Sequence, residues 1–163
     1  ITGSRAYQRT SATAADDEVE FERLDIFRGL SRAECATLRA MVEPRRFARG
    51  DVVFAEGDAG SELFLVVRGS ASVHLRQQDG GATRLVSFSA GTVFGELALL
   101  DRAPRSATVV ADDDLVCYVL TDTALRKLQA EHPAIAIELI INLAREVSSS
   151  LRRATRTIHH LVS

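Results

Sequence analysis

The chain has 163 residues, of which 46% are hydrophobic and 26% are charged, and its formal net charge is −2 at pH 7. This length allows one domain with a real hydrophobic core, and the balanced charge argues against a broad surface for nucleic acid. The longest apolar run, near residues 135–143, is interrupted by Glu138 and Asn142 and is too short to span a bilayer. We therefore expect a cytoplasmic domain with no nucleic-acid partner and no direct membrane insertion.

The first residues of the chain indicate where the domain begins. Residues 1–15 have the composition of a linker or tail, and the first residue is Ile rather than Met. We predict one domain over residues 16–163, preceded by an upstream domain of a longer parent chain.

Cys35 and Cys117 lie far apart without metal-type spacing, so we expect buried, reduced thiols rather than a disulfide.

Residues 16–43 predict two N-terminal helices. The first has an acidic start and is ended by Gly29. Its apolar spacing is carried by Val19, Phe21, Leu24 and Phe27. Ser31 and Glu34 predict a capping box for the second helix, which ends near Pro44.

Residues 44–120 predict a small antiparallel β-roll or jelly roll. Seven or eight short apolar runs alternate there with turn sequences. The continuous apolar run from Leu63 to Val67 indicates a strand that is covered on both sides. The stretch Asp79-Gly80-Gly81 is typical of a hairpin turn.

The stretch from Phe94 to Ala107 predicts an anion site. Gly95 can take a positive φ, and the residues after it favour about one turn of helix. The first backbone N–H groups of a helix have no internal partner, so those of Glu96, Leu97 and Ala98 would face an anion placed before them.

Two further side chains are expected to reach the same anion. Ala103 precedes Pro104 and is biased to an extended conformation, which turns Arg105 and Ser106 back toward the helix start. The arginine fork suits two phosphate oxygens. Glu96 would repel a phosphate, but it fits a ligand that also offers a hydroxyl donor, such as a ribose 2′-OH. The alternative is a structural ion pair between Glu96 and Arg105.

From Phe94 to Val109 the sequence resembles the phosphate-binding cassette of the cyclic nucleotide-binding domain family. The pattern is an apolar residue, Gly-Glu-x-small-apolar, a short spacer, and Arg-[Ser/Thr/Ala]-Ala-x-apolar, and it is matched at every position. The Gly57-Asp58 and Leu63 to Gly69 stretches match another glycine signature of the family in outline. The resemblance covers about residues 22–155 and implies the same β-roll, with C-terminal helices that close over the ligand.

By this resemblance the ligand is cyclic AMP (cAMP), in preference to cyclic GMP (cGMP), although Ser106 is compatible with either base. The base needs an apolar wall, which strand residues such as Val73 and Val86 could supply, with the start of the last helix as a lid.

Residues 121–163 predict two C-terminal helices, with Pro133 at the first position of the second. The second helix carries a heptad seam. Its members are Ile140, Ala144, Val147, Leu151, Ala154, Ile158 and Leu161. The first half of this seam could pack on the roll of its own chain, whereas the second half predicts a homodimer.

The sequence contains no legible catalytic or metal cluster, and we predict neither catalysis nor a metal. Of the four histidines, His74 alone falls on a predicted roll strand. We expect a regulatory module at the C-terminal end of a larger enzyme or transporter. The alternatives are the ligand-binding half of a CRP-like transcription regulator, for which the chain leaves no room for a helix-turn-helix, and a degenerate domain that only dimerises.

Overall fold

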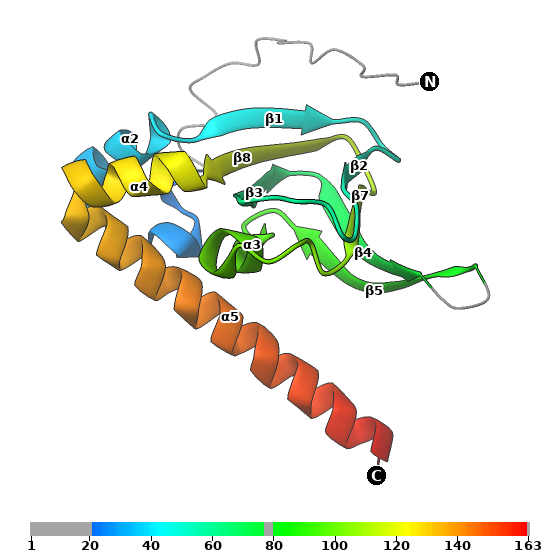
Figure 1. Ribbon diagram of the computed structural model, residues 1–163. Coiled ribbons are helices and arrows are strands. Elements are labelled where there is room, and N and C mark those ends of the chain that lie inside the picture. Colours follow the sequence, from blue (N-terminus) through cyan, green and yellow to red (C-terminus); the bar gives the residue numbers. More distant parts are fainter. Residues whose placement is uncertain (1–20, 77–79, 163) are drawn as a thin grey trace.

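The computed structural model of the chain describes residues 21–76 and 80–162, apart from the side chains of residue 76 and of residues 157–162. Two antiparallel sheets face each other, and helices from both ends of the sequence lie beside them (Figure 1). The predicted linker at 1–15 and the acidic helix start at residues 16 and 17 lie outside the described residues.

The two sheets contain four strands each in the described residues, with the orders β1-β8-β3-β6 and β2-β7-β4-β5. The strand bounds are β1 (Glu43–Phe47), β2 (Val52–Phe54), β3 (Glu62–Arg68), β4 (Ser70–Arg76), β5 (Ala82–Ser89), β6 (Val93–Phe94), β7 (Thr108–Ala111) and β8 (Leu115–Thr121). Every pairing between them is antiparallel. The predicted β-roll is therefore confirmed.

Strand β3 is buried over five successive residues, as its continuous apolar run predicts. Side chains alternate along a strand, and those of β3 enter two different cores. Leu63 and Leu65 pack in the cluster that the helices share. Phe64 and Val66 pack in the cluster inside the roll. Strand β3 thus connects the helical layer to the interior of the roll.

The first predicted helix does not continue to Phe27, and this prediction was wrong. Helical residues end at Glu22, Leu24 is extended, and a short 3-10 helix, η1 (Asp25–Phe27), follows. The rings of Phe21 and Phe27 stack at 4.2 Å between centroids. Six residues of straight helix would place these rings about 120° apart around the axis, so the break at Leu24 is what lets them stack in the core.

The second N-terminal helix, α2 (Arg32–Arg39), has the predicted capping box. The Glu34 backbone N–H donates to Ser31 Oγ, and the Ser31 backbone N–H donates to the Glu34 carboxylate at 2.7 Å. Cys35 is buried on its inner face, and Cys117 is buried in β8. Burial raises the pKa of the Cys117 thiol to about 12, so both cysteines lie in the core as protonated, unpaired thiols.

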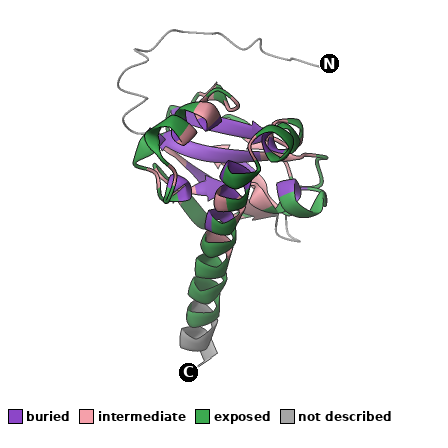
Figure 2. Ribbon diagram, turned by 90° about the vertical axis from the view of Figure 1, so that its left-hand side faces the viewer, coloured by how far each residue is buried: buried purple, intermediate pink, exposed green. Residues whose placement is uncertain are grey.

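The C-terminal helices are α4 (Asp122–Glu131), capped by the Thr121 hydroxyl, and α5 (Pro133–Val162). The first half of α5 packs on the domain, whereas its distal half extends away and is exposed over residues 148–156 (Figure 2). The described part of the chain has no helix long and apolar enough to cross a membrane.

The face of α5 that packs on the domain is not the predicted heptad seam. The buried apolar residues are Ile135, Ala136, Leu139 and Leu143. The seam members Ala144, Leu151 and Ala154 are exposed, and Ile140 and Val147 are half-buried. The side chains of Ile158 and Leu161 lie outside the described residues. Thus α5 carries two apolar stripes, and the seam is the outward one.

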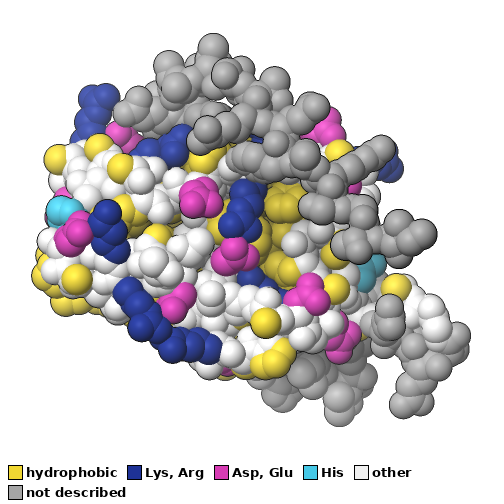
Figure 3. Space-filling view, turned by 45° about the horizontal axis from the view of Figure 1, so that its top comes forward, with side chains coloured by type: hydrophobic (Ala, Val, Ile, Leu, Met, Phe, Trp, Pro, Cys, Tyr) yellow, Lys and Arg dark blue, Asp and Glu magenta, His cyan; other side chains and the backbone are white. Residues whose placement is uncertain are grey.

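Charges of opposite sign lie next to each other on the surface. Basic side chains stand beside acidic ones, with hydrophobic area between them, on the face that Figure 3 shows. The Arg84–Asp112 ion pair at 2.8 Å connects β5 to the turn after β7, and the Arg126–Asp122 pair at 3.0 Å lies within α4.

Asn142 attaches α5 to the N-terminal segment and is 3% exposed. Its Nδ2 group donates to the backbone carbonyls of Ile26 and Arg28 at 2.9 and 2.8 Å. We predict that Asn142→Ala lowers the free energy of unfolding by about 2 kcal/mol, because both carbonyls lose a donor and the bond to Ile26 is buried. Urea denaturation measures this change. The exposed Ser148→Ala on the same helix serves as the control, and equal stability of the two variants would contradict the prediction.

Candidate functional site

A cavity of about 330 Å³ opens between α3 (Glu96–Asp101), the β4–β5 hairpin and the segment around Arg105. This volume lies in the range of small-molecule sites. All eight residues that the sequence analysis selects line it, namely Val73, Val86, Gly95, Glu96, Leu97, Ala98, Arg105 and Ser106. Predicted positions more than thirty residues apart in the chain therefore meet at one place.

Gly95 begins the site, in the left-handed conformation and at the N-cap of α3, with φ of 76°. A Cβ at this position would lie 2.8 Å from Arg105 Nη1 and 3.0 Å from the Glu62 carbonyl oxygen. Glycine is needed here for both conformation and close approach. Among the described residues no side chain caps α3, so the first-turn N–H groups of Leu97 and Ala98 point at the cavity end of the helix.

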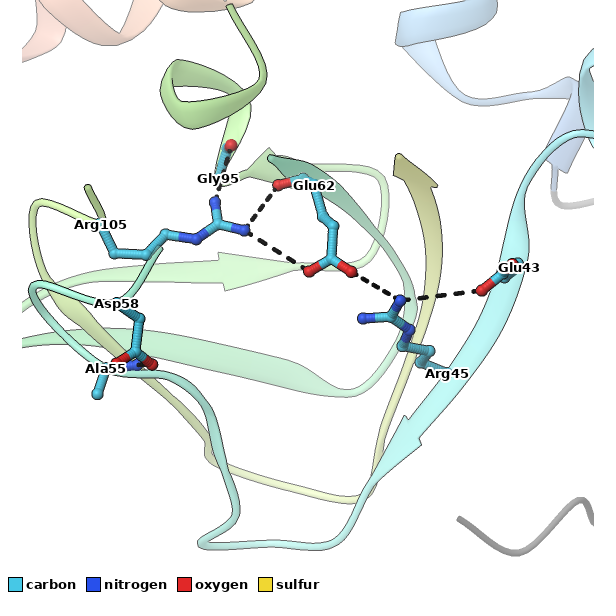
Figure 4. Close-up of polar contacts among 7 residues, drawn as sticks. All are labelled: Glu43, Arg45, Ala55, Asp58, Glu62, Gly95 and Arg105. Atoms are coloured by element: carbon cyan, nitrogen blue, oxygen red, sulfur yellow. Dashed lines mark hydrogen bonds and ion pairs between the residues drawn. The ribbon is translucent and has the colours of Figure 1, made fainter. Parts of the chain in front are cut away.

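Arg105 is the buried cation of the site and is 4% exposed. Its Nη1 donates to the Gly95 carbonyl at 3.1 Å, and its Nη2 donates to the Glu62 carbonyl at 3.0 Å. Both bonds are drawn in Figure 4. The guanidinium carbon also lies 4.1 Å from the ring centroid of Phe54. The guanidinium plane is therefore fixed before any ligand arrives.

The loop with the Gly57-Asp58 signature holds the backbone of Arg105. The Arg105 N–H donates to the Asp58 carbonyl at 2.9 Å, and the Gly57 N–H donates to the Arg105 carbonyl at 2.8 Å. A Cβ on Gly60 would lie 2.5 Å from Arg105 Nε. The Gly57-Asp58 loop thus belongs to the same site as the stretch from Phe94 to Val109.

The two charged residues of the site have perturbed pKa values. Burial lowers the pKa of Arg105, and the nearby carboxylates of Glu62, Asp58 and Glu96 oppose this change. Burial raises the pKa of Glu96. A hydrogen bond from its own backbone N–H lowers that pKa, the charge of Glu146 on α5 raises it, and the charge of Arg105 lowers it. Ionised Glu96 is therefore poorly solvated in the cavity.

The alternative of a structural Glu96–Arg105 ion pair does not describe this geometry. The carboxylate paired with Arg105 is that of Glu62, whose Oε2 lies 3.9 Å from Nη2. Glu96 is half-buried and lines the cavity beside Arg105. A cationic and an anionic group thus face one cavity, which suits a ligand with an acidic part and a hydroxyl donor.

The apolar part of the cavity comes from the second sheet and from aromatic rings. Val73 is half-buried and Val86 is 52% exposed, and both line the cavity. Phe88 stacks on Phe94 at 5.0 Å between centroids, and both rings also line it. Ser150 of α5 reaches the same cavity. The cavity can therefore cover a flat apolar group of a ligand beside the charged side chains of Arg105 and Glu96.

Sequence analysis missed three residues that surround the Arg105 guanidinium. Phe54 stacks on the Arg105 guanidinium, Gly60 gives it space, and Glu62 accepts from it. The spacing Gly57-Asp58-Ala59-Gly60 was the available signal, but it does not show which strand the loop adjoins. His74 lies on β4, as the sequence predicts for a roll strand; it is half-buried, and its Nε2 lies 2.9 Å from Ser72 Oγ. In the described residues no group of three His, Cys, Asp or Glu side chains could hold a metal.

Comparison with known proteins gives a family and several relatives. The sequence model of the cyclic nucleotide-binding domain matches residues 44–132, which is more than half of the chain. The chain is 31% identical over 146 residues to a CRP-like cAMP-activated global transcriptional regulator of Mycobacterium tuberculosis. It is 45% identical over 99 residues to a cAMP-dependent protein kinase regulatory subunit of Mycosarcoma maydis. It is also 30% identical over 147 residues to Glutaminase 1 of Bradyrhizobium diazoefficiens.

These matches cover most of this chain but only part of each relative. They span 90%, 59% and 90% of this chain, but 63%, 19% and 23% of the regulator, the kinase subunit and the glutaminase. Each relative therefore contains a large region that has no counterpart here.

A solved structure shows the same architecture. The cyclic nucleotide-binding domain from Methylobacillus flagellatus superposes with a TM-score of 0.79 at 27% identity, over 87% of this chain and 83% of that one. The agreement includes the β-roll that frames the cavity. The chain belongs to the cyclic nucleotide-binding domain family.

Proposed function

We propose that this chain is a regulatory module that binds cAMP in preference to cGMP and transmits binding through α4 and α5. The observation that carries the proposal is the buried Arg105 guanidinium, held beside the start of α3 in the cavity that Glu96 also lines. A buried cation whose paired carboxylate lies 3.9 Å away, beyond hydrogen-bond distance, favours an anionic ligand.

The parts of a cyclic nucleotide match the groups of the cavity. Its single phosphate charge would be bound by Arg105, by the Ser106 hydroxyl and by the N–H groups of Leu97 and Ala98. Its ribose 2′-OH would donate to the Glu96 carboxylate. Its base would lie against Val73 and Val86, two of the apolar strand residues that line the cavity.

The preference for cAMP is supported by two relatives. The mycobacterial regulator is named as cAMP-activated, and the Mycosarcoma subunit is named as cAMP-dependent. Ser106 offers one hydroxyl near the phosphate position and is compatible with either base. Binding of cGMP with equal or higher affinity would therefore revise the ligand without moving the site.

Transmission through the C-terminal helices rests on the position of α5 beside the site. Ser150 lines the cavity, and the charge of Glu146 raises the pKa of Glu96. A ligand shifts a conformational equilibrium only by its differential affinity for the two states. Ser150 lines the cavity only while α5 lies beside it, so the affinity for the ligand would depend on the position of this helix.

The parent protein is proposed to be a larger enzyme or transporter that this module regulates without catalysing a reaction itself. The 30% match to part of Glutaminase 1 supports an enzyme as parent. The match to 63% of the mycobacterial regulator supports the second candidate, the ligand-binding half of a CRP-like transcription regulator. A degenerate domain that only dimerises is disfavoured, because Glu96 and Arg105 both line the cavity.

A homodimer through α5 is the proposed assembly. The heptad seam lies outward, with Leu151 67% exposed and Ala144 and Ala154 exposed. A second copy of the helix would bury this stripe without displacing the face that packs on the roll.

Arg105→Ala is predicted to weaken cAMP binding by about 2–5 kcal/mol, because it removes one partner of a desolvated charge pair. Isothermal titration calorimetry measures the affinity, and circular dichroism checks that the variant folds. Arg102→Ala, at an exposed arginine three positions earlier, is the control and should change the affinity by less than about 0.5 kcal/mol. Unchanged affinity of the Arg105 variant would refute the site.

The affinity for cAMP is predicted to fall as the pH is lowered from about 8 to about 5. Burial raises the pKa of Glu96 in the free domain, and a 2′-OH donor stabilises the ionised form. Binding therefore requires loss of a proton once the pH is below that raised pKa. Calorimetry at several pH values measures the slope. Glu96→Gln should bind cAMP more weakly at pH 8, and its affinity should change little with pH. If its affinity changed with pH as much as that of the unmodified chain, a group other than Glu96 would be the one that titrates.

Light scattering at micromolar concentration is predicted to give a dimeric mass for the chain. Leu151→Glu should give a monomer, because it places a charge in the apolar seam. Ser149→Glu, on the opposite side of the helix from Leu151, should remain dimeric. A monomeric mass for the unmodified chain would count against the dimer.

A further inference from the structure

Three charged side chains, those of Glu62, Arg45 and Glu43, connect the buried Arg105 to the edge of the first sheet. Arg105 Nη2 lies 3.9 Å from Glu62 Oε2, Glu62 Oε1 lies 2.8 Å from Arg45 Nη2, and Arg45 Nη2 lies 3.8 Å from Glu43 Oε2. Figure 4 shows them as one series from the cavity to β1. Arg45 stands on β1. Its two partners in this series are Glu62 and Glu43, and neither of them lines the cavity.

The Glu62 carboxylate is shared unequally between the two arginines. Arg45 Nη2 donates a hydrogen bond to it at 2.8 Å. The 3.9 Å separation from Arg105 is an ion pair but too long for a hydrogen bond. The hydrogen bonds of Arg105 within this group go to backbone carbonyls, those of Gly95 and of Glu62 itself. The side chain of Glu62 is thus not needed to orient the guanidinium.

A carboxylate at this distance competes with an anionic ligand. It attracts the guanidinium that a phosphate would use, and the Arg105 side chain is only 3% exposed, so water screens the attraction poorly. If the carboxylate moved about 1 Å closer, it could accept a direct hydrogen bond. The hydrogen bond from Arg45 opposes that movement.

We propose that Arg45 determines the affinity of the cavity for its anionic ligand by holding the Glu62 carboxylate away from Arg105. The inference rests on the proposed function, in which Arg105 binds the phosphate. Arg45 acts as a positioning residue and Glu62 as an internal competitor of the ligand. The two residues of one ion pair should therefore have opposite effects on affinity.

Four proteins test the proposal in a double-mutant cycle, with cAMP as the titrant in calorimetry at about 0.15 M salt, where charges more than about 8 Å apart are screened. Arg45→Gln releases Glu62 and should weaken binding about threefold to tenfold. Glu62→Gln removes the competing charge and should strengthen binding by a similar factor. The double variant should bind like Glu62→Gln alone, because Arg45 then has nothing to restrain.

Two further variants separate this effect from general loss of charge or of fold. Arg46→Gln changes the neighbouring residue of β1, whose side chain points to the opposite face, and it should leave the affinity unchanged. Arg45→Lys keeps the cation beside Glu62 and should restore most of the affinity lost in Arg45→Gln. Urea denaturation of every variant checks that the folded population is complete at the titration temperature.

Opposite changes in the two single variants, with no effect of Arg45→Gln on the Glu62→Gln background, support the proposal. It is overturned if both single variants bind more weakly, or if Arg45→Gln weakens binding equally on both backgrounds. Failure of the proposed function has a different signature. In that case the unmodified chain and Arg105→Ala would give the same heat signal, and the inference about Arg45 would fall with it.

Discussion

The burial of Arg105 is the constraint on which the rest of the site depends. A guanidinium that is 4% exposed must have its N–H groups bonded, and here two backbone carbonyls accept from it. One carbonyl precedes α3 and the other begins β3, so a single side chain connects segments that are distant in sequence. The glycines at 60 and 95 follow from this, because a Cβ at either place would contact the guanidinium.

The same arrangement supports the proposal that the cavity binds an anion that also carries a hydroxyl. Arg105 is buried with carboxylates nearby but with none in direct hydrogen-bond contact. Glu96 is driven by burial toward its neutral form. A ligand that presents a phosphate to the first group and a hydroxyl donor to the second relieves both costs at once. The series through Glu62 and Arg45 adds a way to adjust how strongly Arg105 attracts the phosphate.

Local sequence signals were enough for much of the fold and for the centre of the site. The capping box at Ser31, the start of α3 after Gly95 and the doubly covered β3 each depend on residues close in sequence. The break at Leu24 was missed because it depends on ring stacking within the folded core. Phe54 and Glu62 were missed for a similar reason, since neither lies near Arg105 until the strands pair. On α5, two apolar stripes coexist, and only the packing on the roll decides which one is buried.

The central claim is that the cavity recognises a cyclic phosphate together with its ribose. Thermal unfolding in the presence of nucleotides tests this claim most directly. A ligand that binds the native state raises the unfolding midpoint, and at equal concentration the tighter ligand raises it more. We expect cAMP to raise the midpoint more than cGMP, and linear 5′-AMP at the same concentration to leave it nearly unchanged. A midpoint that neither cyclic nucleotide moves would contradict the claim.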